Sequence, residues 1–195
     1  MGLNIEKQTG DFLPWVKFDA KSGKWKAKID GVEQEIANPT FVADFSSIRT
    51  GWIEFGGVGM PPTFVQHPSL TVKAPRPSEK AKEGFKLKLF SKASFGGVGE
   101  MTANSMHLIN AISEMYDLYE KDAANNVGKL PVIKCNGTET MKDKLGTNYK
   151  PRFELVKWVD RPVELDSGSA PKPAPVATAS PSQPAAAQSN NISEF

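Results

Sequence analysis

The sequence predicts a mainly β domain that carries one α-helix and a disordered C-terminal tail. Three observations support this fold class. Short segments of alternating apolar and polar residues recur between residues 15 and 159, and one longer segment has helical periodicity. The last 30 of the 195 residues contain five Pro, seven Ala and six Ser.

Eight segments have the alternation and the β-branched or aromatic content of strands. They are residues 15–19, 24–29, 32–36, 41–45, 48–55, 85–90, 130–136 and 152–159. A four-residue connection ending in Gly23 separates the first two, and Asp30-Gly31 separates the second from the third. Both connections are typical of tight turns, so the first three segments are expected to pair as hairpins.

Residues 103–124 are the one segment with helical periodicity. Apolar side chains recur there at three- and four-residue spacing, at Met106, Ile109, Ile112, Met115, Tyr116 and Tyr119. Capping residues flank the segment: Thr102 or Asn104 at its start, and Asn125, Asn126 and Gly128 at its end.

The order of these elements indicates a more specific architecture. The five-stranded OB barrel has the same succession of elements, in which strands are followed by one helix and then by two further strands. Here an extra hairpin and a long basic loop over residues 61–83 are added to it. An SH3-like barrel, or a β-sandwich with a side helix, is the alternative that the same order allows.

Composition places the end of the folded unit near Leu165. Residues 166–195 hold only three larger apolar side chains, too few to offset the entropy of ordering the segment. The expected organisation is therefore one domain over residues 1–165 and a tail over residues 166–195. Their net charges are 23 − 20 = +3 and 1 − 2 = −1.

Several classes of protein have no support in the sequence. No run of 18 apolar residues and no secretory signal is found, so a soluble intracellular protein is expected. One cysteine, Cys135, and two histidines exclude an internal disulfide framework and a cysteine-based zinc cluster.

The glycine clusters at residues 55–60 and 95–100 lack the P-loop pattern and are interpreted as turns or bulges. We expect no enzyme, no catalytic residue, no metal and no cofactor.

Basic residues share strand faces with aromatic residues. Alternation places Lys24, Lys26 and Lys28 on one face of residues 24–29, Lys86, Lys88 and Phe90 on one face of residues 85–90, and Trp15 with Lys17 on the outward face of residues 15–19. Lysines that follow phosphates and aromatic rings that stack bases are typical of a surface for single-stranded nucleic acid. Arg49, Lys73, Arg76 and Lys134 are further candidates. The alternative is that these lysines only keep exposed strands soluble.

Two blocks and the chain end carry a family resemblance. Residues 84–90 (GFKLKLF), residues 148–159 (NYKPRFELVKWV) and the terminal Ile192-Ser193-Glu194-Phe195 resemble single-stranded DNA-binding proteins of tailed bacteriophages. The resemblance implies an OB-fold that coats single-stranded DNA in replication or recombination, in the cytoplasm of an infected bacterial host. It also implies that Ile192, Glu194 and Phe195 contact replication or recombination proteins. A solubilising tail, and a phage structural or accessory β domain without nucleic-acid binding, are the alternatives.

Overall fold

The computed structural model describes residues 13–56, 62–144 and 146–166. This part of the chain forms nine strands, one long helix, one short helix and two 3-10 turns. The strands are β1 (Trp15–Asp19), β2 (Lys24–Ile29), β3 (Val32–Ile36), β4 (Thr40–Glu54), β5 (Thr63–Gln66), β6 (Lys82–Ser91), β7 (Gly97–Ala103), β8 (Lys129–Asp143) and β9 (Gly146–Asp160). The helices are α1 (Lys92–Phe95) and α2 (Met106–Asp122), and the 3-10 turns are η1 (Ala123–Asn125) and η2 (Val163–Leu165). The prediction of a mainly β domain with one long helix is confirmed.

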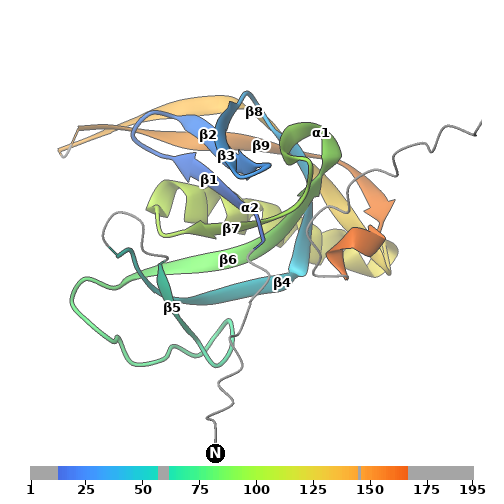
Figure 1. Ribbon diagram of the computed structural model, residues 1–195. Coiled ribbons are helices and arrows are strands. Elements are labelled where there is room, and N and C mark those ends of the chain that lie inside the picture. The colour runs from blue at the N-terminus through green and yellow to red at the C-terminus, as the bar shows by residue number, and fades with distance from the viewer. Residues whose placement is uncertain (1–12, 57–61, 145, 167–195) are drawn as a thin grey trace, which may run out of the picture.

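All nine strands join in one curled sheet (Figure 1). Its strand order is β3-β2-β1-β7-β6-β4-β8-β9, and β5 pairs with β4 beside this path. The β1–β7 pair is parallel, and the other pairs are antiparallel. The expected count of five strands is therefore wrong. The N-terminal meander β1–β3 does not stand apart as a hairpin, because its first strand extends the sheet along β7.

Strand β4 joins two segments that the sequence divided at Ser46-Ser47. Its pairing with β6 shifts register between Asp44 and Arg49, which marks a bulge. There Ser47 Oγ donates to the carbonyl of Asp44 at 2.7 Å and accepts a hydrogen bond from the backbone N–H of Lys88 at 3.0 Å. The chain bends without ending the strand because this hydroxyl replaces the missing ladder partners.

Strand β7 lies where the second glycine cluster was interpreted as a turn. Only its first glycine lies in a turn, where Gly96 ends α1 in the left-handed conformation with φ of 77°, and Gly97 is already the first residue of β7. Gly99 lies inside the strand, where an added Cβ would be 2.8 Å from Cγ2 of Val16. This glycine allows the close approach of β1. The first cluster lies largely outside the described residues.

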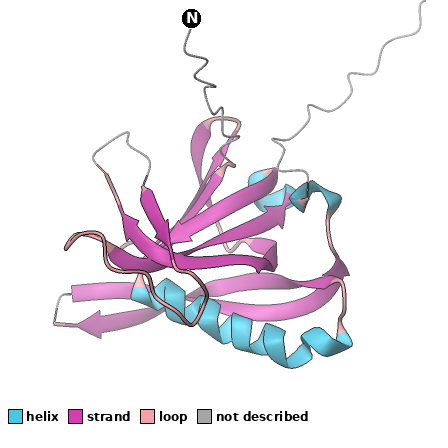
Figure 2. Cartoon of the chain, turned by 90° about the horizontal axis from the view of Figure 1, so that it is seen from below, coloured by secondary structure: helices cyan, strands magenta, loops and turns pink. Residues whose placement is uncertain are grey.

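Helix α2 packs along one face of the sheet, next to the β8–β9 hairpin (Figure 2). It begins at Met106 after Ser105 and ends before Asn125, Asn126 and Gly128, within three residues of the expected limits. Its buried stripe is Leu108, Ala111, Ile112 and Met115, which have the helical spacing. Met106 was expected in this stripe, but 62% of its surface is exposed.

Two apolar cores stabilise opposite sides of the sheet. The main core lies between α2 and the strands and includes an aromatic group, Phe18, Trp25, Phe41 and Phe153. A smaller core lies on the other side of the sheet, where η2 packs on β6 and β7 and Leu165 joins apolar side chains of β4, β7 and β8. Its buried members are Val42, Val98, Leu130, Val132 and Leu165. We call the side of the sheet that packs on α2 the inner face and the opposite side the outer face.

Candidate nucleic-acid interface

The outer face carries the predicted basic side chains. On β6, Phe85, Leu87 and Leu89 are at most 3% exposed in the main core, so the alternate residues point outward. The same alternation confirms the expected facing of the three strands, and the outward side chains are Trp15 and Lys17 on β1, Lys24, Lys26 and Lys28 on β2, and Lys86, Lys88 and Phe90 on β6.

Strand register brings four of these predicted residues together. Trp15 lies beside Glu100 on β7, and Glu100 lies beside Lys88 on β6. Lys86, one pair further along β6, lies beside Arg49 on β4. Residues from four neighbouring strands thus form one surface, although the sequence separates Trp15 from Lys86 by 71 positions.

The cations of this surface differ in how strongly carboxylates hold them. Lys86 Nζ lies 3.1 Å from Glu100 Oε1. Lys17, Arg49 and Lys88 form no ion pair within the described residues. Asp44, the register partner of Lys88, is bound by Arg161 instead. Three positive charges therefore remain available to an anionic ligand.

Phe64 is an aromatic member of this surface that the sequence analysis missed. It lies on β5, inside the segment expected to be a basic loop, and pairs with Ile53 of β4. Its ring occupies space left by Gly51, where an added Cβ would lie 2.8 Å from two ring atoms. Lys86 Nζ lies 5.2 Å from the ring centroid, a cation–π distance. We call Trp15, Lys17, Arg49, Phe64, Lys86 and Lys88 the outer patch.

A sequence signal for Phe64 existed. Residues 63–66, Thr-Phe-Val-Gln, have strand composition but lie within the predicted basic loop over residues 61–83. Gly51 in the middle of a strand was the second signal, because an interior glycine often marks the close approach of another group.

The lysines of β2 are held by acidic residues of β3. Lys24 Nζ lies 2.8 Å from Glu35, and Lys26 Nζ lies 2.7 Å from Glu33. The hydrogen bond with Glu33 raises the pKa of Lys26 above its ordinary value. Lys28 is exposed and lies opposite Glu33 of β3, the residue that forms the ion pair with Lys26. The three lysines share one face as predicted, but that face has its own carboxylates.

Phe90 is at the covered end of the outer face. The alternation turns it to the same side as Lys86 and Lys88, but its ring packs against the smaller core, where Leu165 is 1% exposed. Lys92 Nζ lies 5.9 Å from the ring centroid. The expectation of an aromatic on a solvated face is therefore wrong for Phe90, because residues 161–166 cover this end of the strand.

The remaining candidates lie apart from the outer patch. Lys73 forms an ion pair with Glu83 beside α2. Arg76 donates to the carbonyls of Glu79 and Ala81 and stacks on Trp52, so it organises its own loop. Lys134 is exposed on β8, opposite Thr40 at the far end of β4 from Arg49. Ile192, Glu194 and Phe195 lie outside the described residues.

No family model, curated protein or solved structure matches this chain. Within residues 13–56, 62–144 and 146–166, no helix is both long enough and apolar enough to cross a lipid bilayer.

Proposed function

We propose that this protein binds single-stranded DNA without sequence preference and coats it during phage replication or recombination, with no enzymatic activity. The observation that carries the proposal is the outer patch, in which four cations and two aromatic side chains share one open face across five strands. Cations bind phosphates at any sequence, and exposed ring faces stack any base, at about 1–3 kcal/mol per base.

The strand connectivity supports an OB-like core within the larger sheet. Strands β4, β6 and β7 pair in succession, α2 follows β7, and β8 and β9 follow α2. Strand β8 returns to pair with β4, as the first and fourth strands of an OB barrel do. The chain departs from a closed barrel at one place, because β7 pairs with β1 rather than with β9.

The position of the outer patch agrees with this assignment. OB-folds bind oligonucleotides on the face of their second and third strands and with the loop between the first and second. The corresponding elements here are β6, β7 and the connection that contains β5. Lys86 and Lys88 belong to the second strand, and Phe64 belongs to that connection.

The rival function is that of a phage structural or accessory β domain. The observation in its favour is that Lys24, Lys26 and Lys86 each form an ion pair with a neighbouring glutamate, as solvated strand lysines do. A structural domain of this kind would not bind oligothymidine.

Tryptophan fluorescence titration separates the two functions. The full chain is titrated with oligothymidine and with a duplex of equal length, both at low salt. The proposal predicts saturable quenching by oligothymidine, weaker binding of the duplex, and loss of most of the quenching in Trp15→Phe. Trp158→Phe is the matched control, because Trp158 stacks on Tyr119 on the other side of the sheet. Absence of saturable binding, or equal affinity for the duplex, would contradict the proposal.

A further inference from the structure

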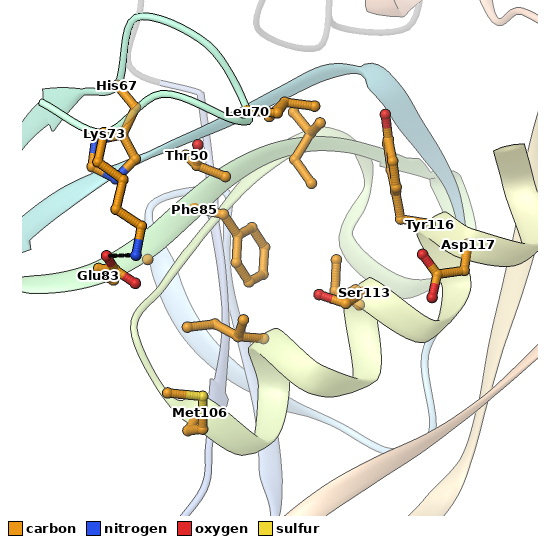
Figure 3. Close-up of a pocket in the computed structure, with 14 residues that line it drawn as sticks. Thr50, His67, Leu70, Lys73, Glu83, Phe85, Met106, Ser113, Tyr116 and Asp117 are labelled. Atoms are coloured by element: carbon orange, nitrogen blue, oxygen red, sulfur yellow. Dashed lines mark ion pairs between the residues drawn. The ribbon is translucent and has the colours of Figure 1, made fainter.

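An apolar groove opens on the inner face, on the opposite side of β4 and β6 from the outer patch. It has a volume of about 370 Å³ and lies between α2 and the loop over residues 67–73 (Figure 3). Ile48, Phe85 and Ile112 are among the apolar side chains that line it. This volume is within the range of protein sites that hold a ligand or an anchoring side chain.

The rims of the groove are exposed apolar side chains. Met106, at the start of α2, is 62% exposed, and Leu70, on the facing loop, is 51% exposed. Figure 3 shows them on opposite sides of Phe85. Such side chains around a concave apolar surface indicate a binding site more strongly than scattered exposed apolar residues do.

One buried polar group in the groove lacks a partner. The Thr50 hydroxyl is buried and has no hydrogen-bond partner within the described residues, at a cost of about 1–3 kcal/mol. Its neighbour His67 is engaged, because His67 Nδ1 accepts a hydrogen bond from Ala74 N–H at 3.2 Å. Lys73 and Glu83 pair with each other at the groove edge.

The charge around the groove selects against nucleic acid. Helix α2 carries Glu114, Asp117, Glu120 and Asp122 against Lys121, and because Lys150 of β9 pairs with Glu114 a net charge of −2 remains, with Asp117 lining the groove. The two chain ends outside the described residues are not basic either, since residues 1–12 carry −1 and residues 167–195 carry 0. The groove and its surroundings therefore complement a basic ligand that is not one of these segments.

We propose that this groove docks a protein partner through large apolar side chains that are flanked by Lys or Arg. The apolar side chains fill the space over Phe85 between Met106 and Leu70, and the basic residues lie along the acidic surface of α2. The inference does not depend on DNA binding. Because the groove and the outer patch lie on opposite faces of the sheet, both can be occupied at once.

The experiment uses methyl NMR on the full chain, with the signals of Met106 and Ile109 as reporters. The probe is the synthetic peptide N-acetyl-Arg-Leu-Phe-Arg amide. One control peptide replaces both Arg by Glu, and another replaces Leu and Phe by Ser. We expect saturable shifts with the first peptide, binding of the Glu peptide weaker by about fivefold or more, and no saturable shift with the Ser peptide.

Matched variants locate the site. Met106→Lys should abolish peptide binding, whereas Leu118→Lys should not, because Leu118 is exposed on the same helix but does not line the groove. Asp117→Lys should remove the preference for the Arg peptide. None of these three variants should change the affinity for oligothymidine. Circular dichroism confirms that each variant folds, and Leu70→Lys repeats the test from the other rim.

Four results would overturn the proposal. The first is no saturable shift with the Arg peptide, and the second is equal weakening by Leu118→Lys and Met106→Lys. The third is a shift of the Met106 signal in Ile5→Ser or Phe195→Ser without peptide, which would assign the groove to a segment of the chain itself. The fourth is a shift of the same signal by oligothymidine, which would assign it to nucleic acid.

Discussion

Lys86 and Phe90 stand four residues apart on the same face of one strand, yet their surroundings are opposite. Lys86 lies in the outer patch, next to the partly buried ring of Phe64 and the exposed Arg49. Phe90 lies under residues 161–166 and packs against the smaller core. The comparison teaches that alternation determines which face a strand residue occupies, whereas a distant segment determines whether that face is open.

A buried ion pair fastens the segment that covers Phe90. Arg161 binds both carboxylate oxygens of Asp44, at 2.9 and 2.8 Å, and Asp44 is 1% exposed. Burial alone would raise the pKa of Asp44, but hydrogen bonds from Arg161 and Ser46 outweigh burial and lower it. The covered end is therefore a structural contact, and the open end is the part of the face that is accessible to a ligand.

The largest change is expected in the unfolding free energy, when the contact that covers the Phe90 end of β6 is broken. Arg161→Met leaves Asp44 buried without its cation, which should cost about 3 kcal/mol of unfolding free energy, at the lower end for buried pairs because Arg161 is partly exposed. Urea denaturation measures the change. The control is Lys92→Met, which removes the exposed Lys92–Glu164 pair and should cost less than about 1 kcal/mol. An equal loss of unfolding free energy in the two variants would show that the Arg161–Asp44 ion pair does not hold residues 161–166 on the sheet.

The same pair should make the covered end sensitive to acid. Because folding lowers the pKa of Asp44, the stability it contributes is complete above the ordinary aspartate pKa of about 4 and is lost as the pH falls through the lowered value. The difference in unfolding free energy between the wild type and Asp44→Asn should therefore shrink below about pH 4. A difference that is constant from pH 7 to pH 2 would contradict this account.

Alanine substitution of the two phenylalanines compares the ends directly. Phe64→Ala should weaken oligothymidine binding by about 1–3 kcal/mol with a small change in stability, since its ring is available to stack a base. Phe90→Ala should lower the unfolding free energy by about 2 kcal/mol, less than for a fully buried phenylalanine, with affinity per folded molecule unchanged. If Phe90→Ala weakens oligothymidine binding more than Phe64→Ala does, the DNA-binding surface lies at the Phe90 end of the outer face and not at the outer patch.

Salt dependence distinguishes the cations within the outer face. Arg49→Ala and Lys88→Ala should each flatten the log–log salt slope of oligothymidine binding by up to about 0.7, the value for one phosphate contact on a single strand. Lys24→Ala and Lys26→Ala should flatten it less, because Glu35 and Glu33 hold these lysines. If all four variants have the same salt slope as the wild type, these side chains do not contact phosphates, which contradicts the proposal.

The smallest effect is expected from the tail. Arg161 binds Asp166, the first residue of the predicted tail. A chain that ends after Asp166 should keep the melting temperature of the full chain, since residues 167–195 hold few apolar groups to bury. A lower melting temperature would show that the tail contributes to the domain.

Local pattern predicted much of the fold. The first three strands match the expected ranges residue for residue, because alternation and turn glycines determine them nearby in sequence. Strand β7 was missed because one of its partners, β1, lies far along the chain, and β5, which pairs with the nearby β4, was missed because it falls inside the predicted basic loop. Gly99, for example, needs β1 beside it before its place in a strand is evident.

The candidate site was predictable in part for the same reason. The facing of Lys86 and Lys88 follows from period-two alternation. The pairing of Lys26 with Glu33 joins the two strands of an expected hairpin. The covering of Phe90 and the packing of the Phe64 ring over Gly51 depend on contacts between segments that no single strand pattern contains. Sequence therefore identified the lysine faces but not which part of them is open.

Photocrosslinking tests most directly the claim that the open end of the outer face binds single-stranded DNA. The full chain is irradiated with oligothymidine that carries 5-bromodeoxyuridine at single positions, and mass spectrometry locates the crosslinked residues. The account predicts crosslinks at Phe64 or Trp15, with none at Phe90 or on α2. Crosslinks confined to α2 or to residues 161–166 would contradict it.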